Sequence, residues 1–141
     1  MKLNIRKFKL NDEEEVIDLW RACGLVVPWN NPHLDIQRKL KVQPELFQVG
    51  CLDGKVIASV MAGYEGHRGW VNYLAVHPDY QRRGIGRKMM EQIEKLLLAQ
   101  GCPKINLQVR KTNEEVIIFY QRIGFKDDNV IGMGKRLILD D

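Results

Sequence analysis

The alternation of hydrophobic and polar residues predicts six strands and four helices. Period-two runs bounded by turn residues are typical of strands, and apolar residues three and four apart are typical of helices. These elements follow one another in the order β-α-α-β-β-β-α-β-α-β. The expected strands are 3–8, 46–52, 55–62, 71–76, 104–109 and 130–138, and the expected helices are 11–23, 34–42, 85–100 and 113–123.

Two connections define the character of the expected sheet. Asp53-Gly54, between two strands, is a strong hairpin signal, so these strands should run antiparallel. The strand 71–76, the helix after it and the strand 104–109 form a βαβ unit, so its two strands should run parallel. The sequence therefore predicts an α/β (α+β) fold with a mixed central sheet and helices on its faces, and its 141 residues fit one domain over residues 1–141.

The loop between 71–76 and the next helix predicts a site for a phosphate-bearing ligand. Gly84 and Gly86 open the helix, where backbone N–H groups lack partners within the helix and the helix dipole attracts anions. No G-x-x-x-x-G-K-[ST] motif occurs, and Met89 stands at the third glycine position of the dinucleotide fingerprint. A plain helix-start loop is the alternative. The basic residues of this segment are Arg82, Arg83, Arg87 and Lys88.

The wider context resembles the GNAT family of N-acetyltransferases. QRRGIG fits the family's Q/R-x-x-G-x-G/A motif, LAVHPDYQRRGIGRKMM is similar to its acetyl-CoA segment, and VRKTNEEVIIFYQRIGF is similar to its second half. PWNNPHLDIQRK and GYEGHRG resemble the PWN-x-P and GY-[DE]-GHRG motifs of a small bacterial branch. The resemblance covers nearly the whole chain. It implies a GNAT-like sheet whose parallel strands splay apart at one end and hold the cofactor.

The resemblance also implies acetyl-CoA as co-substrate. The pantetheine arm is expected to pair with the backbone of Leu74 and Val76 like an added strand, with the Val76 N–H as the oxyanion donor. The implied cofactor-binding residues are Leu74, Ala75, Val76, Gln81, Arg82, Arg83, Gly84, Ile85, Gly86, Arg87, Lys88, Asn113 and Tyr120.

Acetyl transfer to an amine requires a neutral amine, a stabilised oxyanion and a proton for the departing thiolate. The resemblance places Tyr120 beside the cofactor sulfur, and a phenol with a pKa of about 10 can donate that proton, so Tyr120 is the expected general acid. Packing of Tyr120 in the core is the alternative. Glu65 is the expected base, with His67 as a second candidate and a plain turn carboxylate as the alternative. Some relatives carry a glutamate where Gln108 stands, and an amide cannot take the proton.

The connector LVVPWNNPHLD is expected to bind the acceptor, because connectors carry specificity in such folds. Trp29 offers an aromatic surface, and Trp29, Asn30 and Arg68 are the expected acceptor-binding residues. Packing of Trp29 on the sheet is the alternative. Arg68, together with Arg38 and Lys39, would favour an acceptor with a carboxylate.

Composition narrows the remaining choices. Three widely spaced cysteines match no metal pattern and fit reduced thiols, so no metal is expected. No apolar run reaches the roughly 20 residues that span a bilayer, and the N-terminus lacks the apolar core of a signal peptide, so we expect a cytoplasmic protein without a membrane partner. The basic cluster RRGIGRK lacks interleaved aromatic residues, which argues against nucleic acid.

Two readings of the function remain open. The first is an acetyl-CoA-dependent N-acetyltransferase, in which the primary amine of a small molecule or peptide attacks the thioester directly in a ternary complex. The second is a non-catalytic acyl-CoA-binding module. The sequence leaves the acceptor amine, the base and a homodimer undecided.

Overall fold

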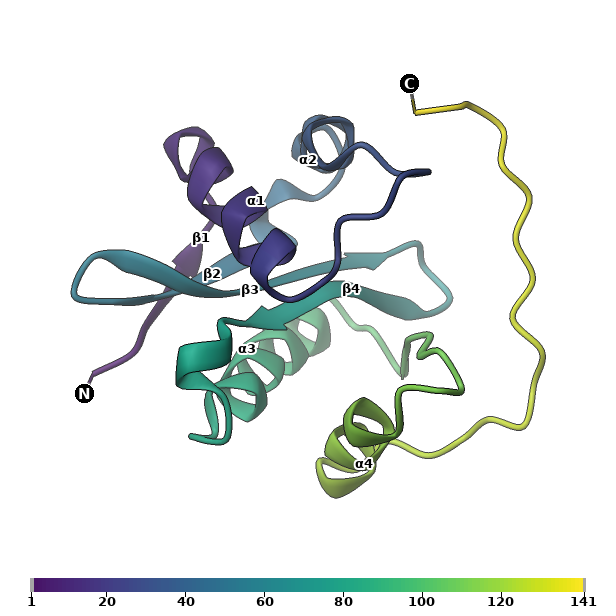
Figure 1. Ribbon diagram of the computed structural model, residues 1–141. Coiled ribbons are helices and arrows are strands. Elements are labelled where there is room, and N and C mark those ends of the chain that lie inside the picture. The colour runs from purple at the N-terminus through teal and green to yellow at the C-terminus, as the bar shows by residue number, and fades with distance from the viewer. Residues whose placement is uncertain (1, 141) are drawn as a thin grey trace.

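A five-stranded sheet in the order β1-β2-β3-β4-β5 forms the centre of the molecule (Figure 1). The structure is a computed structural model, and it describes residues 2–140. Neighbouring strands pair antiparallel except for β4 and β5, which are parallel. The expected mixed sheet is therefore confirmed. The strands are β1 (Asn4–Lys7), β2 (Phe47–Leu52), β3 (Lys55–Tyr64), β4 (Gly69–Val76) and β5 (Ile105–Asn106).

Helices cover both faces of this sheet. Helices α1 and α2 lie on one face and α3 lies on the other, with α4 beyond α3 on the same side (Figure 1). In the part of the chain that the structure describes, no helix is long and apolar enough to cross a membrane. The helices are α1 (Glu13–Ala22), α2 (Pro32–Leu40), α3 (Ile85–Ala99) and α4 (Glu114–Arg122), and the short 3-10 helices are η1 (Leu10–Asp12), η2 (Pro44–Leu46) and η3 (Pro78–Tyr80).

Each face of the sheet has its own hydrophobic core. Trp20 of α1 and Ile36 of α2 are fully buried on one face, and Met89 and Ile93 of α3 are fully buried on the other. These residues lie on the apolar faces of their amphipathic helices. Full burial of such a side chain contributes roughly 1.5–3 kcal/mol. The two cores hold the sheet between the helices and thereby fix the positions of the loops at its edges.

Local sequence signals account for two of the connections. Asp53 and Gly54 both have positive φ, 51° and 76°, as a two-residue type I′ hairpin requires. Asn31 caps α2, because its side-chain oxygen accepts the backbone N–H of His33 at 3.0 Å, and Pro32 occupies the first turn. The helix therefore begins at Pro32, slightly earlier than the expected residue 34.

The expected final strand at 130–138 does not form. Past α4 the described chain runs in an extended path along one side of the molecule and ends near α2 (Figure 1). Large hydrophobic residues on it are exposed, including Ile131 at 86% and Met133 at 89%. An alternating pattern makes a strand only where a neighbouring edge is available to pair with it, and Gly132 and Gly134 weaken the strand propensity further. Strand β5, with two residues, is also shorter than the expected 104–109.

Strand β4 carries a β-bulge at its centre. Ser59 pairs with Ala75 and Met61 pairs with Asn72, which leaves two residues of β4 opposite one residue of β3. Tyr73 is in the bulge and has a φ of 52°, a left-handed conformation that is uncommon for a bulky residue. Such a conformation costs on the order of 1–3 kcal/mol and persists where surrounding contacts hold it.

The bulge changes which face of the sheet each side chain reaches. Val71, before the bulge, packs in the core on the α3 side, whereas Tyr73 and Ala75 pack in the core on the α1 side. Pairing between β4 and β5 ends just before the bulge, at Trp70 and Asn106. The expected splay of the two parallel strands is therefore confirmed, and it begins where β4 bends.

Candidate active site

The N-terminus of α3 is an open cradle at the end of β4. Gly84 is the N-cap of α3 with a φ of 77°, and Arg82 in the same loop has a φ of 64°. A Cβ added to Gly84 would have no atom within 4 Å, so the space above it is free. The first amides of α3 lack acceptors within the helix and carry the positive end of its dipole. This geometry can hold the pyrophosphate of a nucleotide cofactor.

Gly86 lies in a different environment from Gly84. A Cβ added to Gly86 would lie 3.1 Å from Cζ of Phe119 and 3.8 Å from Cγ2 of Val76. The missing side chain therefore makes room for Phe119 of α4. Both glycines were expected to let a phosphate approach the backbone. The space above Gly84 is open, whereas Gly86 allows two helices to pack closely.

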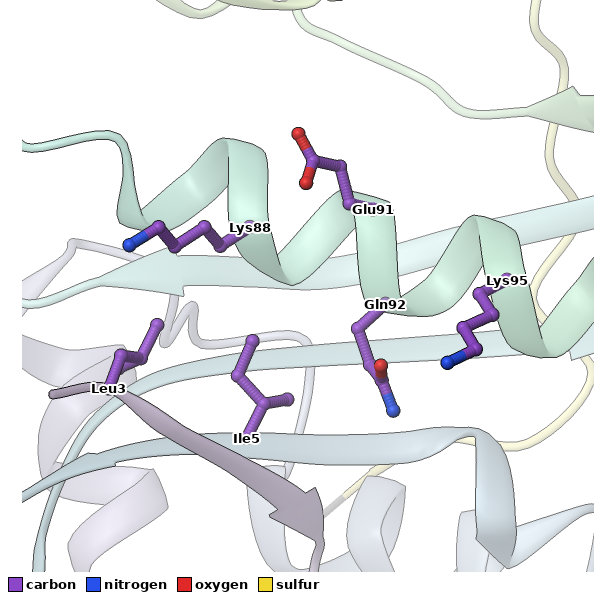
Figure 2. A pocket seen from close by; sticks show the side chains of 6 residues that line it. All are labelled: Leu3, Ile5, Lys88, Glu91, Gln92 and Lys95. Carbon is purple, nitrogen blue, oxygen red and sulfur yellow. The ribbon is translucent and has the colours of Figure 1, made fainter.

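The basic side chains of the cradle point in several directions. The guanidinium of Arg83 lies 5.5 Å from the centre of the Tyr80 ring. The Nε of Arg87 lies 3.9 Å from a carboxylate oxygen of Glu91 one turn later. Lys88 lines a hollow between α3 and the N-terminal strand, and Figure 2 shows its side chain reaching back toward the N-terminal end of α3. Positive charge thus surrounds the helix start without converging on one point.

The edge of β4 after the bulge faces the gap left by β5. The N–H of His77 donates to the carbonyl of Ile57 on β3 at 2.8 Å. Because backbone groups alternate sides along a strand, those of Leu74 and Val76 point away from β3, into the gap. This is the edge expected to pair with a pantetheine arm, and the N–H of Val76, the expected oxyanion donor, lies on it.

The carbonyl of Val76 already has partners within the protein. It accepts a hydrogen bond from Nε2 of Gln81 at 2.9 Å and another from the thiol of Cys23 at 3.3 Å. Burial raises the pKa of the Cys23 thiol, so it stays protonated and able to donate. Gln81 therefore supports the turn into the cradle from within, and the outward-facing N–H groups of this edge are left for a ligand.

Tyr120 is buried in α4, with an exposed fraction of 9%. Its ring meets Phe119 and Phe125 edge to face, with centroids 5.1 and 5.3 Å away. Burial raises the pKa of its phenol to about 12, so the proton is held throughout the neutral range. Asn113 is the N-cap residue of α4, but its side chain makes no capping hydrogen bond. The side-chain amide of Asn113 therefore does not cap α4.

Glu65 lies in the turn between β3 and β4, at the opposite end of β4 from the cradle. Its carboxylate accepts the backbone N–H of Arg68 and that of His67, the latter at 2.6 Å. These two hydrogen bonds, the one from Arg68 first, lower the pKa of the Glu65 carboxyl. Arg68 itself folds back and donates to the His67 carbonyl at 2.9 Å. The turn thus binds the carboxylate, and a lowered pKa makes it a weaker base.

The connector before α2, which carries Trp29 and Asn30, contacts the chain that follows β5. Trp29 is 57% exposed, and the guanidinium of Arg110, just past β5, lies 5.9 Å from its ring centre. Arg136 donates to the carbonyl of Trp29 and to the side-chain oxygen of Asn30. The exposure of Trp29 disagrees with the alternative in which it packs on the sheet. Its ring is largely exposed to solvent, with the Arg110 guanidinium over it.

Arg38 and Lys39, which were expected to favour an acceptor with a carboxylate, have partners within the protein. Arg38 donates to Asp140 at 2.9 Å. Lys39 donates from Nζ to the carbonyl of Ala62 at 2.5 Å, and burial lowers its pKa. These contacts remove the support that Arg38 and Lys39 lent to an acidic acceptor.

A hydrogen bond joins Tyr73 of β4 to Asp35 of α2. The phenol of Tyr73, in the bulge, donates to Oδ2 of Asp35 at 2.5 Å. Desolvation first, and then the Asp35 carboxylate, raise the pKa of Tyr73, which keeps its proton. Asp35 was not among the residues that the sequence pattern singled out, although it stands in the DIQRK stretch of the branch motif. Only the bulge brings the two side chains to the same face.

Trp20 contacts the side chain of Tyr73, and Ser59 contacts its backbone. Its ring stacks on Trp20 with centroids 3.8 Å apart and planes within 12°. Ser59 accepts a hydrogen bond from the Trp20 indole at 2.9 Å and donates one to the Tyr73 carbonyl at 2.9 Å. Contacts from α1 and β3 therefore stabilise the strained bulge and fix the phenol in place.

Comparison with known proteins places this geometry in context. The model of the acetyltransferase (GNAT) family matches residues 13–125. An acetyltransferase of Yersinia pestis (strain Pestoides F) is 49% identical over 138 residues, and one of Sodalis glossinidius (strain morsitans) is 50% identical over 139 residues. Each alignment covers 98% of this chain and 98% of the relative.

Solved structures share the fold at low sequence identity. AAC(6')-Iy in complex with a bisubstrate analogue, CoA-S-monomethyl-acetylneamine, is 18% identical with a TM-score of 0.79, covering 96% of this chain and 99% of the other. The ribosomal-protein-S18-alanine N-acetyltransferase from Escherichia coli is 24% identical with a TM-score of 0.75, covering 89% of this chain and 78% of the other. At these identities the likeness shows a common fold.

Proposed function

Since this chain belongs to the acetyltransferase (GNAT) family and is an N-acetyltransferase with acetyl-CoA as co-substrate, we propose that a primary amine attacks the thioester directly in a ternary complex. Pairing between β4 and β5 ends at Trp70 and Asn106, and both substrates would share the space beyond that point. When both substrates are bound side by side, the amine can attack the thioester directly. No covalent intermediate on the protein is then required, because binding already holds the reacting atoms together. The observation that carries the proposal is the open cradle at Gly84 next to the exposed edge of β4.

The cofactor would lie along two backbone segments. Loop residues 81–84 and the first amides of α3 would bind the pyrophosphate, and the outward edge at Leu74 and Val76 would pair with the pantetheine arm. Arg82, Arg83, Arg87 and Lys88 would supply positive charge around the phosphates. Asn113, whose side chain does not cap α4, would contact the cofactor from the opposite side.

Two groups would serve the chemical step. The N–H of Val76 would stabilise the oxyanion that forms on the thioester carbonyl. Tyr120 would then protonate the departing thiolate, because its phenol is in the protonated form at neutral pH. When bound, acetyl-CoA supplies the activated acyl group.

The removal of the amine proton is assigned to no side chain. Glu65, the base expected from the sequence, is bound by the amides of its own turn, and its lowered pKa makes it a poor acceptor of that proton. His67 lies in the same exposed turn. Water that enters the open gap would carry the proton away.

The acceptor would be the amine of a small molecule or a peptide, and Trp29, Asn30 and Arg68 would line its approach. Among the similar structures, AAC(6')-Iy is bound to an analogue that carries monomethyl-acetylneamine, and the Escherichia coli protein is a ribosomal-protein-S18-alanine N-acetyltransferase. The three cysteines are free thiols, which fits a reducing compartment such as the cytoplasm.

A coupled assay tests the proposed reaction. Purified protein is mixed with acetyl-CoA and a panel of primary amines, and thiol release is followed together with the mass of the acetylated amine. We expect both signals to rise in equal amounts, without a burst, because no acyl-enzyme accumulates. Thiol release without an acetylated amine, or acetyl bound covalently to the protein during turnover, would contradict direct transfer.

A further inference from the structure

The carboxylate of Asp35 lies on the acceptor side of the gap, and the proposed reaction gives it no role. Asp35 is in the first turn of α2, directly after the connector that carries Trp29. Its Oδ2 accepts the Tyr73 phenol at 2.5 Å. Because Tyr73 belongs to the bulge where β4 leaves β5, its phenol joins the carboxylate to the part of β4 that directly precedes Leu74 and Val76.

The second oxygen of Asp35 has capacity for another partner. Oδ1 forms an ion pair with Nη1 of Arg38 at 3.7 Å, which is beyond hydrogen-bonding distance. Arg38 donates both of its hydrogen bonds to Asp140 instead. The Asp35 side chain is 22% exposed, so a solute can reach it. A partly buried carboxylate with one satisfied oxygen binds a cation well, because its position is already fixed.

On the premise of the proposed function, we propose that Asp35, held by Tyr73, binds a second cationic group of the acceptor. The acceptor is then a diamine or a larger polycationic amine. Its reacting nitrogen must be neutral and adjacent to the thioester, so that nitrogen does not occupy Asp35. A distal ammonium on the same molecule reaches the carboxylate and donates to Oδ1. Arg38 keeps its hydrogen bonds to Asp140 and its longer ion pair with Asp35, so Oδ1 of Asp35 still has room to accept a hydrogen bond from the acceptor.

Three matched acceptors test this specificity. The probes 1,4-diaminobutane, 1-aminobutane and 4-aminobutanoate share one reacting amine and differ at the far end, which is an ammonium, a methyl or a carboxylate. We expect kcat/KM for the diamine to exceed those of the other two by about 10-fold or more, as a charged hydrogen bond allows. The difference should fall mainly on the acceptor KM, and the KM of acetyl-CoA should not change.

Substitutions test whether the preference for the diamine depends on Asp35. Asp35→Asn should reduce the diamine preference to about 2-fold or less, since a neutral amide forms only an ordinary hydrogen bond. Tyr73→Phe keeps the ring on Trp20 but removes the orienting donor, and it should lose part of the preference. Asp18→Asn, on the exposed face of α1, is the matched control and should keep all of it. Coenzyme A affinity measured for each variant reports on folding.

The outcomes separate this inference from the proposed function. If all three amines are acetylated at equal rates, the proposed reaction stands and the role of Asp35 is overturned. If none is acetylated, 1,4-diaminobutane is titrated calorimetrically into the protein with coenzyme A bound. Binding that weakens by about 10-fold in Asp35→Asn supports the inference, and the absence of binding overturns it. A preference that survives in Asp35→Asn also overturns it.

Discussion

Phe119 packs on Gly86 so closely that a Cβ at position 86 would lie 3.1 Å from the Phe119 ring. Gly84, two residues earlier in the same motif, faces open space and holds a φ of 77°. One glycine therefore allows the packing of α4 on the start of α3, and the other shapes the open loop in front of that helix. The two positions should respond differently to substitution.

Gly84→Val should weaken the binding of coenzyme A by about 10-fold or more, because a branched side chain fills the cradle and cannot adopt positive φ without strain. Calorimetric titration measures the affinity, and thermal unfolding measures the stability. Gly84→Asn is the matched control for strain, since asparagine tolerates the left-handed region. It should be more stable than the valine variant and still bind coenzyme A weakly. Unchanged affinity in both folded variants would contradict a cradle at this loop.

Gly86→Val should lower the free energy of unfolding by about 1–3 kcal/mol, because the new side chain overpacks the contact with Phe119. Urea unfolding measures the loss. Combining it with Phe119→Leu should recover part of the stability, since the smaller side chain leaves room. If the double variant is no more stable than Gly86→Val alone, the contact with Phe119 is not the cause.

Tyr120→Phe should lower kcat roughly 100-fold while the affinity for coenzyme A stays the same, because the ring still packs but the proton donor is gone. Since the pKa of the phenol is raised to about 12, its ionisation should leave no inflection in the wild-type rate between pH 6 and 10. Tyr64→Phe, which removes a phenol from the end of β3, is the matched control. Equal kcat values for wild type and Tyr120→Phe would require another donor.

Asp12→Asn should lower the free energy of unfolding at pH 7 by about 2 kcal/mol, because it breaks a charged hydrogen bond with Arg6. Two nitrogens of Arg6 bind the carboxylate at 2.7 and 2.9 Å, and this bond lowers the pKa of Asp12. A lowered pKa means that the stabilisation is complete above the ordinary value of about 4 and is lost as the pH falls toward the folded value. The difference in the free energy of unfolding between wild type and Asp12→Asn should therefore become smaller at acidic pH. Urea unfolding at several pH values measures this difference. A difference that does not change with pH would refute the stabilising role of the Arg6–Asp12 bond.

Truncation after Asn129 should lower the melting temperature by less than about 3 °C, because the removed segment buries little apolar surface. Its exposed residues include Ile131, Met133 and Leu137. The truncated protein should also bind less of an apolar dye such as anilinonaphthalene sulfonate. A much larger drop in melting temperature would show that the segment pairs with the sheet in solution, as its alternating pattern had suggested.

The sequence alone determined the features that depend on neighbouring residues. The periodicity located the helices and the first five strands, Asp53-Gly54 specified the hairpin, and the glycines after β4 marked the start of the helix α3. These features follow from local backbone preferences, which a short segment already contains. The motifs around them were also sufficient to indicate the family.

The tertiary structure decided which side chains meet. One extra residue in β4 shifts the alternation and turns Tyr73 toward Asp35, which lies 38 positions earlier in the chain. Phe119 fills the space at Gly86, and the turn amides bind Glu65. The final apolar run has no strand beside it and stays extended. Such outcomes depend on register and on contacts between distant segments, and no local pattern specifies either of them.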